Sequence, residues 1–483
     1  MAPPAGERSL TGPPAGAARR PPGAECSPAD AAEQAAFATG ARVLSVGIAS
    51  TGLFTFAYLA TASHVLGRED YSRISLCWAI MYVILSVIYR PIEQLLSRTI
   101  ADRRARRDRG HVLRTPAVIQ GSFALAFLAV ALALRGTIER RVLDGSPALY
   151  WILVVGVLAY AASYFARGWL AGNRRFALYG ALVFLESTSR FLFALAVAVG
   201  IASGQTAVGL GMAAAPFASL CVIPLAFTGM RLAGSPLVEV ADAAREGPAH
   251  GQVEEAATDL TLRHGSGFAG AVVAIMLSEQ TLMNAGVLVV AASSGFNLTL
   301  GLTGFVFNVL LIVRAPLQLF QAIQTSILPH LTGLQARENA REFRRSVRVT
   351  VLAIAAFAGA VALGLLAIGP PVMTALLGSH HYVYGRLGLA VVGLGMGFHL
   401  VAGTLNQALL ARARAQRAAA CWLTAAACFV AFVALPTIHR QVERVEVGYC
   451  GATMLLALLL YGIYRREPAG GEPRSGAVEA LAG

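Results

Sequence analysis

The stretch VFNVLLIVRAPLQLFQAIQTSILPHL, residues 306–331, consists mostly of large apolar residues, as expected of a helix that crosses a lipid bilayer. It nevertheless contains Arg314 near its centre and Pro316 two residues later. A charged side chain at the bilayer centre costs about +2.5 to +3.5 kcal/mol on insertion scales, and such residues usually face a water-filled cavity or a partner inside a helix bundle. The stretch therefore predicts a membrane protein in which Arg314 has a partner or a function inside the membrane.

The composition extends this prediction to the whole chain. Hydrophobic residues make up 56% of the 483 residues and charged residues only 13%, whereas soluble domains carry about 25% charged residues. A helix of about 20 apolar residues crosses a bilayer. The hydropathy pattern predicts twelve such helices, near residues 43–63, 74–99, 116–134, 149–167, 178–200, 206–228, 266–292, 299–325, 349–369, 387–409, 418–436 and 446–464. The predicted fold class is an all-α, polytopic membrane protein.

The basic residues indicate how the chain is oriented. All 39 of them are arginine, and they concentrate in both tails and in the loops on one side of the predicted spans. Because cytoplasmic loops carry the excess of basic residues, both termini are expected in the cytoplasm, with the protein in the cytoplasmic membrane. The net charge of +13 then reflects orientation and attraction to anionic membrane lipids, and no nucleic acid is expected as a partner.

The pattern of spans and loops divides the chain into two halves of six spans. The longest predicted loop lies between the sixth and seventh spans, at the midpoint of the chain. Ser27 followed by Pro28 is a helix start signal, so a short amphipathic helix is expected before the first span. The predicted parts are a disordered tail with this short helix (1–41), two six-helix lobes (42–229 and 265–465), a cytoplasmic linker between them (230–264) and a second tail (466–483).

The two halves share a motif that indicates an internal repeat. YRPIEQLLSRT (89–99) in the second span and VRAPLQLFQAIQTS (313–326) in the eighth each place an arginine one or two residues before a proline. Pro91 and Pro316 are expected to kink their helices. Six spans are an even number, so the halves form a parallel repeat, as in transporters with a central site between two lobes.

Several motifs resemble those of bacterial polysaccharide-biosynthesis flippases. They are LGREDYSRIS (66–75), RPIEQLLSR (90–98), ARGWLAGNRRFALYG (166–180), VRAPLQLFQAIQTSILPHL (313–331) and LNQALLARARAQRAA (405–419). These flippases belong to the multidrug/oligosaccharidyl-lipid/polysaccharide exporter (MOP) superfamily, and the resemblance covers residues 40–465. It implies two lobes in a V, alternating access, and a cationic cavity for an isoprenoid-pyrophosphate-linked oligosaccharide. It also implies the glycosyltransferases and glycan polymerase of the same pathway as partners.

Six charged residues lie within the predicted spans, away from their ends. They are Arg90, Glu93, Glu186, Arg190, Glu279 and Arg314. Glu186 and Arg190 are spaced i,i+4, and Arg90 and Glu93 are spaced i,i+3, so each pair can meet on one helix face. Each pair is either a structural ion pair or part of a substrate site.

Glu279 and Arg314 have no opposite charge within one turn of their own helices. Two alternatives follow for Arg314: an ion pair with Glu279 between the seventh and eighth spans, or exposure to a central aqueous cavity. Glu279, with Asn284 nearby, could also bind a coupling cation or take part in gating. Protons, sodium ions and the membrane potential all remain open as the energy source.

The repeat suggests that Arg90 and Arg314 line one cavity and bind the pyrophosphate of the substrate. Guanidinium groups bind phosphate oxygens through two parallel hydrogen bonds. Gln318 and Gln321 continue along the same helix as Arg314 and suit sugar hydroxyl groups.

Two other functions compete with the flippase. A cation-coupled multidrug exporter of the same superfamily would use Glu279 as its carboxylate. A polytopic glycosyltransferase or glycan polymerase would need a roomy outer loop, whereas the loop that carries Glu69 and Asp70 spans about ten residues (64–73). Neither a nucleotide-binding motif nor a metal-ligand cluster occurs in the sequence, so no enzyme activity, cofactor or metal is expected.

Overall fold

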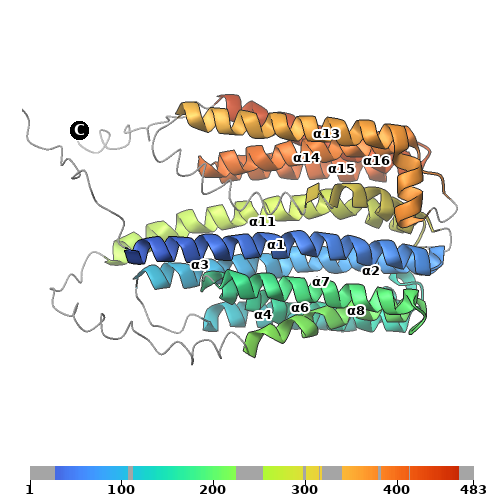
Figure 1. The fold of residues 1–483 in the computed structure, drawn as a ribbon, viewed down its shortest axis with the longest axis horizontal. Coiled ribbons are helices and arrows are strands. Elements are labelled where there is room, and N and C mark those ends of the chain that lie inside the picture. Colours follow the sequence, from blue (N-terminus) through green and yellow to red (C-terminus); the bar gives the residue numbers. More distant parts are fainter. Residues whose placement is uncertain are drawn as a thin grey trace, which may run out of the picture.

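The computed structural model describes residues 28–106, 113–173, 175–224, 254–296, 301–314, 316–317, 340–378, 382–412 and 414–466. Within these ranges the chain forms helices and turns and no strand, which confirms the all-α fold class. The long helices run along the long axis of the molecule (Figure 1). Pro28 and Arg466 lie at one end, called here the tail end. The opposite end, where the turns around Gly67, Gly204 and Tyr384 join the helices, is called the loop end.

The first lobe holds the N-terminal helices. It contains α1 (Pro28–Val65), α2 (Arg68–Ile84), the π-helical turn η1 (Leu85–Tyr89), α3 (Arg90–Arg106), α4 (Arg114–Ala133), α5 (Arg135–Thr137), η2 (Ile138–Val142), α6 (Pro147–Gly172), α7 (Phe176–Ala198) and α8 (Gly204–Leu220). Helix α1 packs along α7, and α6 packs between α3 and α8. The lobe is therefore one bundle with α6 at its centre.

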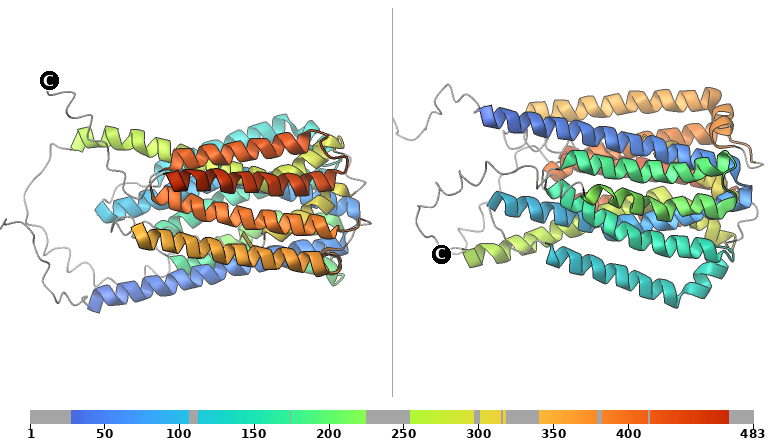
Figure 2. Two further views of the ribbon diagram at one scale, coloured as in Figure 1. Left: turned by 90° about the horizontal axis from the view of Figure 1, so that it is seen from above. Right: turned by 60° about the horizontal axis from the view of Figure 1, so that its bottom comes forward.

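The second lobe holds the C-terminal helices. It contains α11 (Glu254–Ser293), the helix Leu302–Arg314, α13 (Ala340–Leu377), α14 (Arg386–Ala411), α15 (Ala415–Ala434) and α16 (Gln441–Arg466). Helix α14 packs against α13 and α16, and α11 packs against α15. Helices α13 to α16 form one layer, the first lobe forms the other, and α11 lies between them (Figures 1 and 2).

Sequence and burial together show which helices face lipid. Helix α6 starts at a Ser-Pro pair, where Ser146 Oγ accepts the backbone N–H of Leu149 and Pro147 occupies the first helical position. Its most apolar 18 residues are 67% buried, so it is an internal helix. The corresponding windows of α4 and α13 are equally apolar or more so, but only 17% buried. Helices α4 and α13 thus expose most of their apolar residues, and they belong to the lipid-facing sides of the two lobes.

The described helices agree with the predicted spans. Ten of them are long and apolar enough to cross a membrane, and each overlaps one predicted span. The first predicted span lies within α1, and the eighth begins as the shorter helix Leu302–Arg314. Helix α1 runs without a break from Pro28, so the residues predicted as a separate amphipathic helix are its first turns. Helix α11 begins at Glu254, inside the predicted linker, most of which lies outside the described residues.

Candidate functional site

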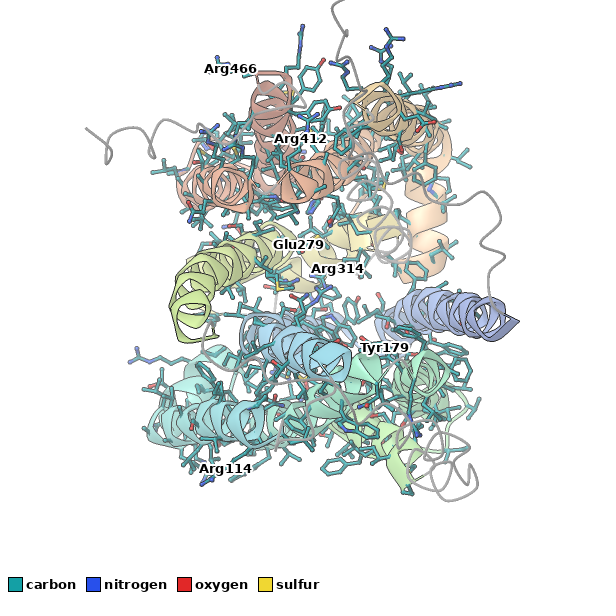
Figure 3. The ribbon with its side chains drawn as sticks, turned by 90° about the vertical axis from the view of Figure 1, so that its left-hand side faces the viewer. Arg114, Tyr179, Glu279, Arg314, Arg412 and Arg466 are labelled. Atoms are coloured by element: carbon teal, nitrogen blue, oxygen red, sulfur yellow. The ribbon has the colours of Figure 1, made fainter. Side chains whose placement is uncertain are left out.

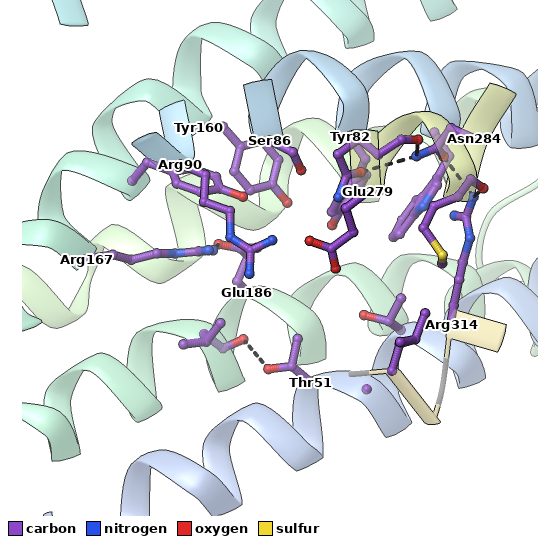
Figure 4. Close-up of a pocket in the computed structure, with 18 of the residues that line it drawn as sticks. Thr51, Tyr82, Ser86, Arg90, Tyr160, Arg167, Glu186, Glu279, Asn284 and Arg314 are labelled. Atoms are coloured by element: carbon purple, nitrogen blue, oxygen red, sulfur yellow. Dashed lines mark hydrogen bonds and ion pairs between the residues drawn. The ribbon is translucent and has the colours of Figure 1, made fainter. Parts of the chain in front are cut away.

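A cavity of about 680 Å³ lies between the two lobes (Figure 4). Its size is typical of a site for a small molecule or a head group. One wall comes from α1, α2, α3, α6 and α7 of the first lobe, and the other comes from α11, the helix Leu302–Arg314 and α14. Seen from the tail end, Glu279 and Arg314 lie in the space between the lobes (Figure 3). The cavity is thus a feature of the lobe interface.

Most of the residues predicted for the site line this cavity. They are the charged residues Arg90, Glu93, Glu186, Glu279 and Arg314, together with Asn284. Arg190 lies directly behind the wall, with 1% of its surface exposed. Gln318 and Gln321 lie outside the described residues, so their placement stays a prediction.

Glu186 is neutralised by two arginines. It forms ion pairs with Arg167 and with Arg190, the second through Arg190 Nη2 and Glu186 Oε1 at 3.1 Å. Ser163 Oγ donates a further hydrogen bond to Glu186 Oε2, 3.2 Å away. The three charged residues are buried, with at most 7% of any residue exposed. The predicted Glu186–Arg190 pair is therefore present, and it belongs to a larger buried network.

Arg190 supports the cavity wall from behind. Its Nη2 donates to the Tyr160 hydroxyl, 2.6 Å away, and its Nη1 lies 3.4 Å from Thr55 Oγ1. Its guanidinium carbon lies 5.0 Å from the ring centre of Trp78 and 5.8 Å from that of Tyr82. All four partners line the cavity, so Arg190 fixes their positions without facing the cavity itself.

The predicted i,i+3 pair of Arg90 and Glu93 does not form. Glu93 accepts a hydrogen bond from the Tyr179 hydroxyl at 2.7 Å. Within the part of the chain that the structure describes, Arg90 makes no hydrogen bond or ion pair. Glu279 faces Arg90 from α11 across the cavity (Figure 4). The two residues do not pair because Glu93 is bonded to Tyr179 while Arg90 faces the cavity.

Glu279 and Arg314 do not form an ion pair in this structure. Arg314 Nη2 donates to the Asn284 side-chain oxygen at 2.8 Å and to the Met283 carbonyl oxygen at 3.1 Å. Its guanidinium carbon lies 4.5 Å from the ring centre of Phe307. Asn284 is five residues beyond Glu279 on α11, which corresponds to a rise of about 7.5 Å. Arg314 therefore contacts α11 more than one helical turn away from Glu279, and no ion pair forms.

Arg314 instead faces the cavity. It is one of the lining residues, and its buried Nε has no hydrogen-bond partner. This is the second of the two sequence alternatives, in which the arginine is open to a central cavity.

Proline has a visible effect on the helix that carries Arg90. Pro91 lacks an N–H and its ring clashes with the carbonyl four residues before it. The turn before it, Leu85–Tyr89, is a π-helical turn, in which the backbone N–H of Arg90 bonds to Leu85 O. Such turns are frequent at functional sites. At the matching place in the second lobe, Pro316 follows Arg314, with residue 315 outside the described residues.

Sequence reasoning missed one charge and the aromatic part of the site. Arg167 was placed at the end of a span, yet it is buried, pairs with Glu186 and lies 4.5 Å from the Tyr164 ring centre. The missed aromatic lining residues are Phe56, Trp78, Tyr82, Tyr160, Tyr164 and Tyr179. Trp78 and Tyr82 are spaced i,i+4, as are Tyr160 and Tyr164, and this one-face spacing is the signal that could have found them.

The acidic pair considered for an enzyme has a structural partner. Arg73 forms ion pairs with both Glu69 and Asp70, and its Nη2 also lies 2.7 Å from Asp144 Oδ2. This cluster is at the loop end, where it joins the start of α2 to the turn before α6. Across the described residues, no group of three His, Cys, Asp or Glu side chains could hold a metal ion.

Comparison with known proteins identifies the fold. Neither a protein-family model nor a curated protein matches this sequence. Among solved structures, an inward-facing multidrug resistance MATE family transporter of the MOP superfamily aligns with a TM-score of 0.56 and 13% identity, over 88% of this chain and 94% of that one. The eukaryotic MATE transporter AtDTX14 aligns with a TM-score of 0.57 and 10% identity, over 91% and 97% of the two chains. The Vibrio cholerae MATE transporter VcmN gives 0.52 and 14%, over 91% and 99%.

These likenesses show that the chain has the two-lobed fold of MATE transporters. The predicted two-lobed arrangement is thereby confirmed. At 10–14% identity these likenesses show the fold alone, and they do not single out a substrate.

Proposed function

We propose that the protein is a transporter of the MOP superfamily that moves an amphipathic substrate across a membrane by alternating access of its two lobes. The fold, the helices long enough to cross a membrane and the cavity between the lobes support this proposal. Transport requires no covalent step, which agrees with an absence of enzyme activity. We further propose that the tail end faces the cytoplasm, as the arginine distribution predicts.

One of the similar structures is described as a multidrug resistance transporter, which favours the alternative of a cation-coupled multidrug exporter. A cationic substrate of such an exporter needs a carboxylate that is free to face it. Glu279 is the candidate, because among the described residues it makes no hydrogen bond or ion pair, whereas Glu186 is held by two arginines. Arg90 faces the same carboxylate, so a bound cation would have to compete with Arg90 for Glu279.

Three arginines and three glutamates line the cavity, and the two arginines that form no ion pair in the described part of the chain are the basis for an anionic head group, the substrate that we consider best supported. Arg90 faces the cavity from the first lobe and Arg314 from the second, and neither forms an ion pair among the described residues. Two arginines on opposite walls can bind a diphosphate between them through bidentate hydrogen bonds. Tyrosine hydroxyls and side-chain amides, such as those of Tyr82, Tyr179 and Gln280, surround them and suit sugar hydroxyls.

We therefore propose that the substrate is an oligosaccharide linked to an isoprenoid pyrophosphate, flipped from the cytoplasmic side for the synthesis of a surface polysaccharide. The single observation that carries this proposal is the pair of arginines on opposite walls, neither of which forms an ion pair among the described residues. Membrane lipids, glycosyltransferases and a glycan polymerase are the partners that this function would involve.

Binding experiments on purified protein in nanodiscs separate the two substrate classes. We expect a polyprenyl diphosphate to bind, and Arg314→Gln to weaken that binding by roughly 10- to 100-fold, as for loss of one partner of a buried charge pair. Arg440→Gln is the matched control, because that arginine is 81% exposed at the loop end. Binding of a lipophilic quaternary ammonium dye that depends on Glu279, with no binding of the diphosphate, would instead establish the multidrug exporter.

A further inference from the structure

A buried hydrogen-bond cluster around Asn308 joins the two lobes at the loop end. Asn308, on the helix Leu302–Arg314, is fully buried, and its side-chain oxygen accepts a hydrogen bond from the Tyr71 hydroxyl of the first lobe. Its Nδ2 lies 3.2 Å from Ser63 Oγ, at the end of α1 in the first lobe. The same Nδ2 lies 3.3 Å from the Leu377 carbonyl oxygen and 3.4 Å from the Tyr384 hydroxyl, both in the second lobe.

Two further contacts tighten this junction. Ser63 Oγ donates a hydrogen bond directly to the Leu377 carbonyl oxygen, which links the end of α1 to the end of α13. The backbone N–H of Gly304 donates to Ser72 Oγ at 3.1 Å. A Cβ at Gly304 would lie 2.9 Å from the Tyr71 ring and 3.0 Å from Ser72 Oγ, so only glycine lets the helix approach α2 this closely.

The chemistry of this cluster suits a reversible closure. Buried polar groups are stable only when they are hydrogen-bonded, so the cluster favours the closed arrangement as long as all its partners meet. When the lobes separate, water can replace the lost partners, and the groups are satisfied again. A purely apolar contact of the same area would be much costlier to expose, since nothing in water replaces apolar packing.

The helix Leu302–Arg314 connects this cluster to the cavity. Asn308 precedes Arg314 by six residues, which is a distance of about 9 Å along a helix. One short, rigid element thus carries both the centre of the cluster and a cation that lines the cavity. Movement of this helix at the loop end must shift Arg314 relative to Arg90 on the other lobe.

We propose that Ser63, Tyr71, Asn308, Leu377 and Tyr384 form a latch that holds the loop end of the lobes shut, and that Asn308 is its central residue. Release of the latch opens the cavity at the loop end and closes it at the tail end. Because Asn308 of the latch and Arg314 lie on one helix, ligand binding at Arg314 changes the equilibrium constant for latch closure. Latch closure changes the affinity for the ligand by the same factor.

Distance measurements between paired spin labels test the latch without any substrate, so their outcome is independent of the substrate proposed above. One pair replaces His64 and Val383, which are exposed at the loop end. A second pair replaces Arg114 and Arg466, which are exposed at the tail end. Labels are placed in full-length protein whose native cysteines have been replaced. We expect Asn308→Leu to lengthen the loop-end distance and shorten the tail-end distance.

The size of the effect follows from the lost hydrogen bonds. The ratio of closed to open molecules should fall by about tenfold or more, since Asn308→Leu leaves Tyr71 and Ser63 with fewer partners only in the closed state. Tyr71→Phe removes a single hydrogen bond and should shift both distances in the same directions but less far. It also keeps the proposal testable if Asn308→Leu does not fold.

Asn406→Leu is the matched control. Asn406 is also buried, but it accepts a hydrogen bond from Trp422 Nε1 within the second lobe. This change should leave both distances as in the parent protein. Unchanged distances in folded Asn308→Leu, or in folded Tyr71→Phe should the leucine variant fail to fold, would overturn the latch. So would an equal opening in Asn406→Leu, because the effect would then be general loosening.

Discussion

At the scale of single residues, the buried charges divide into two groups with different roles. Glu186, Arg167 and Arg190 satisfy one another and hold the first-lobe wall in place. Arg90, Glu279 and Arg314 line the cavity and have no ion-pair partner among the described residues. Spacing allowed an ion pair for each of the two intrahelical pairs, and only Glu186 and Arg190 form one. Which buried charges are paired depends on the rotation of neighbouring helices, which a single sequence does not specify.

Glu186 is expected to be a stability residue. Removing one partner of a buried ion pair leaves an uncompensated charge, which typically costs about 3–5 kcal/mol. Glu186→Gln should therefore lower the thermal unfolding temperature clearly, since it leaves Arg167 and Arg190 without a counter-charge. The double change Glu186→Gln, Arg167→Gln should recover part of that loss, as measured by thermal unfolding in detergent. Strictly additive losses would argue against direct coupling of the two residues.

Glu279 is expected to behave in the opposite way. It forms no ion pair, so Glu279→Gln should change the unfolding temperature little. Glu279→Gln removes the negative charge that faces Arg90 across the cavity. A polyprenyl diphosphate should therefore bind roughly three- to tenfold more tightly, as expected when one charge of the same sign as the ligand is removed from a partly polar site. Titrations at low and high salt would measure the effect. Weaker diphosphate binding in this variant would mean that Glu279 helps to hold the ligand.

At the scale of elements, Arg90 and Arg314 are each followed in the sequence by a proline, Pro91 and Pro316. In the first lobe, the chain accommodates Pro91 by widening the preceding turn into the π-helical turn Leu85–Tyr89. The sequence motif predicted a kink at this position, but the wider turn comes from how the backbone relieves the clash with the proline ring. Arg90 is the first residue after this turn, so its backbone position depends on the wider turn.

Pro91→Ala tests whether the π-helical turn matters for the site. Alanine restores an N–H that can bond to the carbonyl four residues earlier, so the turn can convert to an ordinary α-helical turn. We expect an unfolding temperature equal to or higher than that of the parent, together with weaker binding of a polyprenyl diphosphate because Arg90 is reoriented. Diphosphate affinity equal to that of the parent would show that the turn has no role in positioning Arg90.

At the scale of the whole molecule, the sequence predicts the architecture well and the site in part. Apolar segments of about 20 residues are enough to place the spans, because the bilayer fixes their length. The cavity residues Arg90, Glu279, Asn284 and Arg314 were found from the cost of intramembrane polar groups. Arg167 and the aromatic residues of the cavity wall were missed because arginine and aromatic residues are also common at the ends of membrane helices. Their presence in a span therefore does not by itself indicate a site. The hydrogen bonds that join the lobes connect residues more than 200 positions apart, which no local pattern reveals.

The orientation of the molecule in the membrane can be checked with single cysteines in a background without native cysteines. If the tail end faces the cytoplasm, a membrane-impermeant thiol reagent applied to intact cells should label Val383→Cys at the loop end. It should not label Arg114→Cys or Arg466→Cys until the membrane is made permeable. The reverse pattern would invert the topology and place the latch on the cytoplasmic side.

The most direct test of the central claim is the rate at which the purified protein moves a fluorescent polyprenyl-diphosphate-linked disaccharide across proteoliposome membranes. The account predicts movement by the parent protein and, because each arginine binds the diphosphate, a loss of roughly tenfold or more for Arg90→Ala and for Arg314→Ala. Arg314→Lys should be intermediate, since lysine keeps the charge but not the bidentate geometry. Arg440→Ala should match the parent. A folded Arg314→Ala variant that moves the lipid at the parental rate would contradict the account.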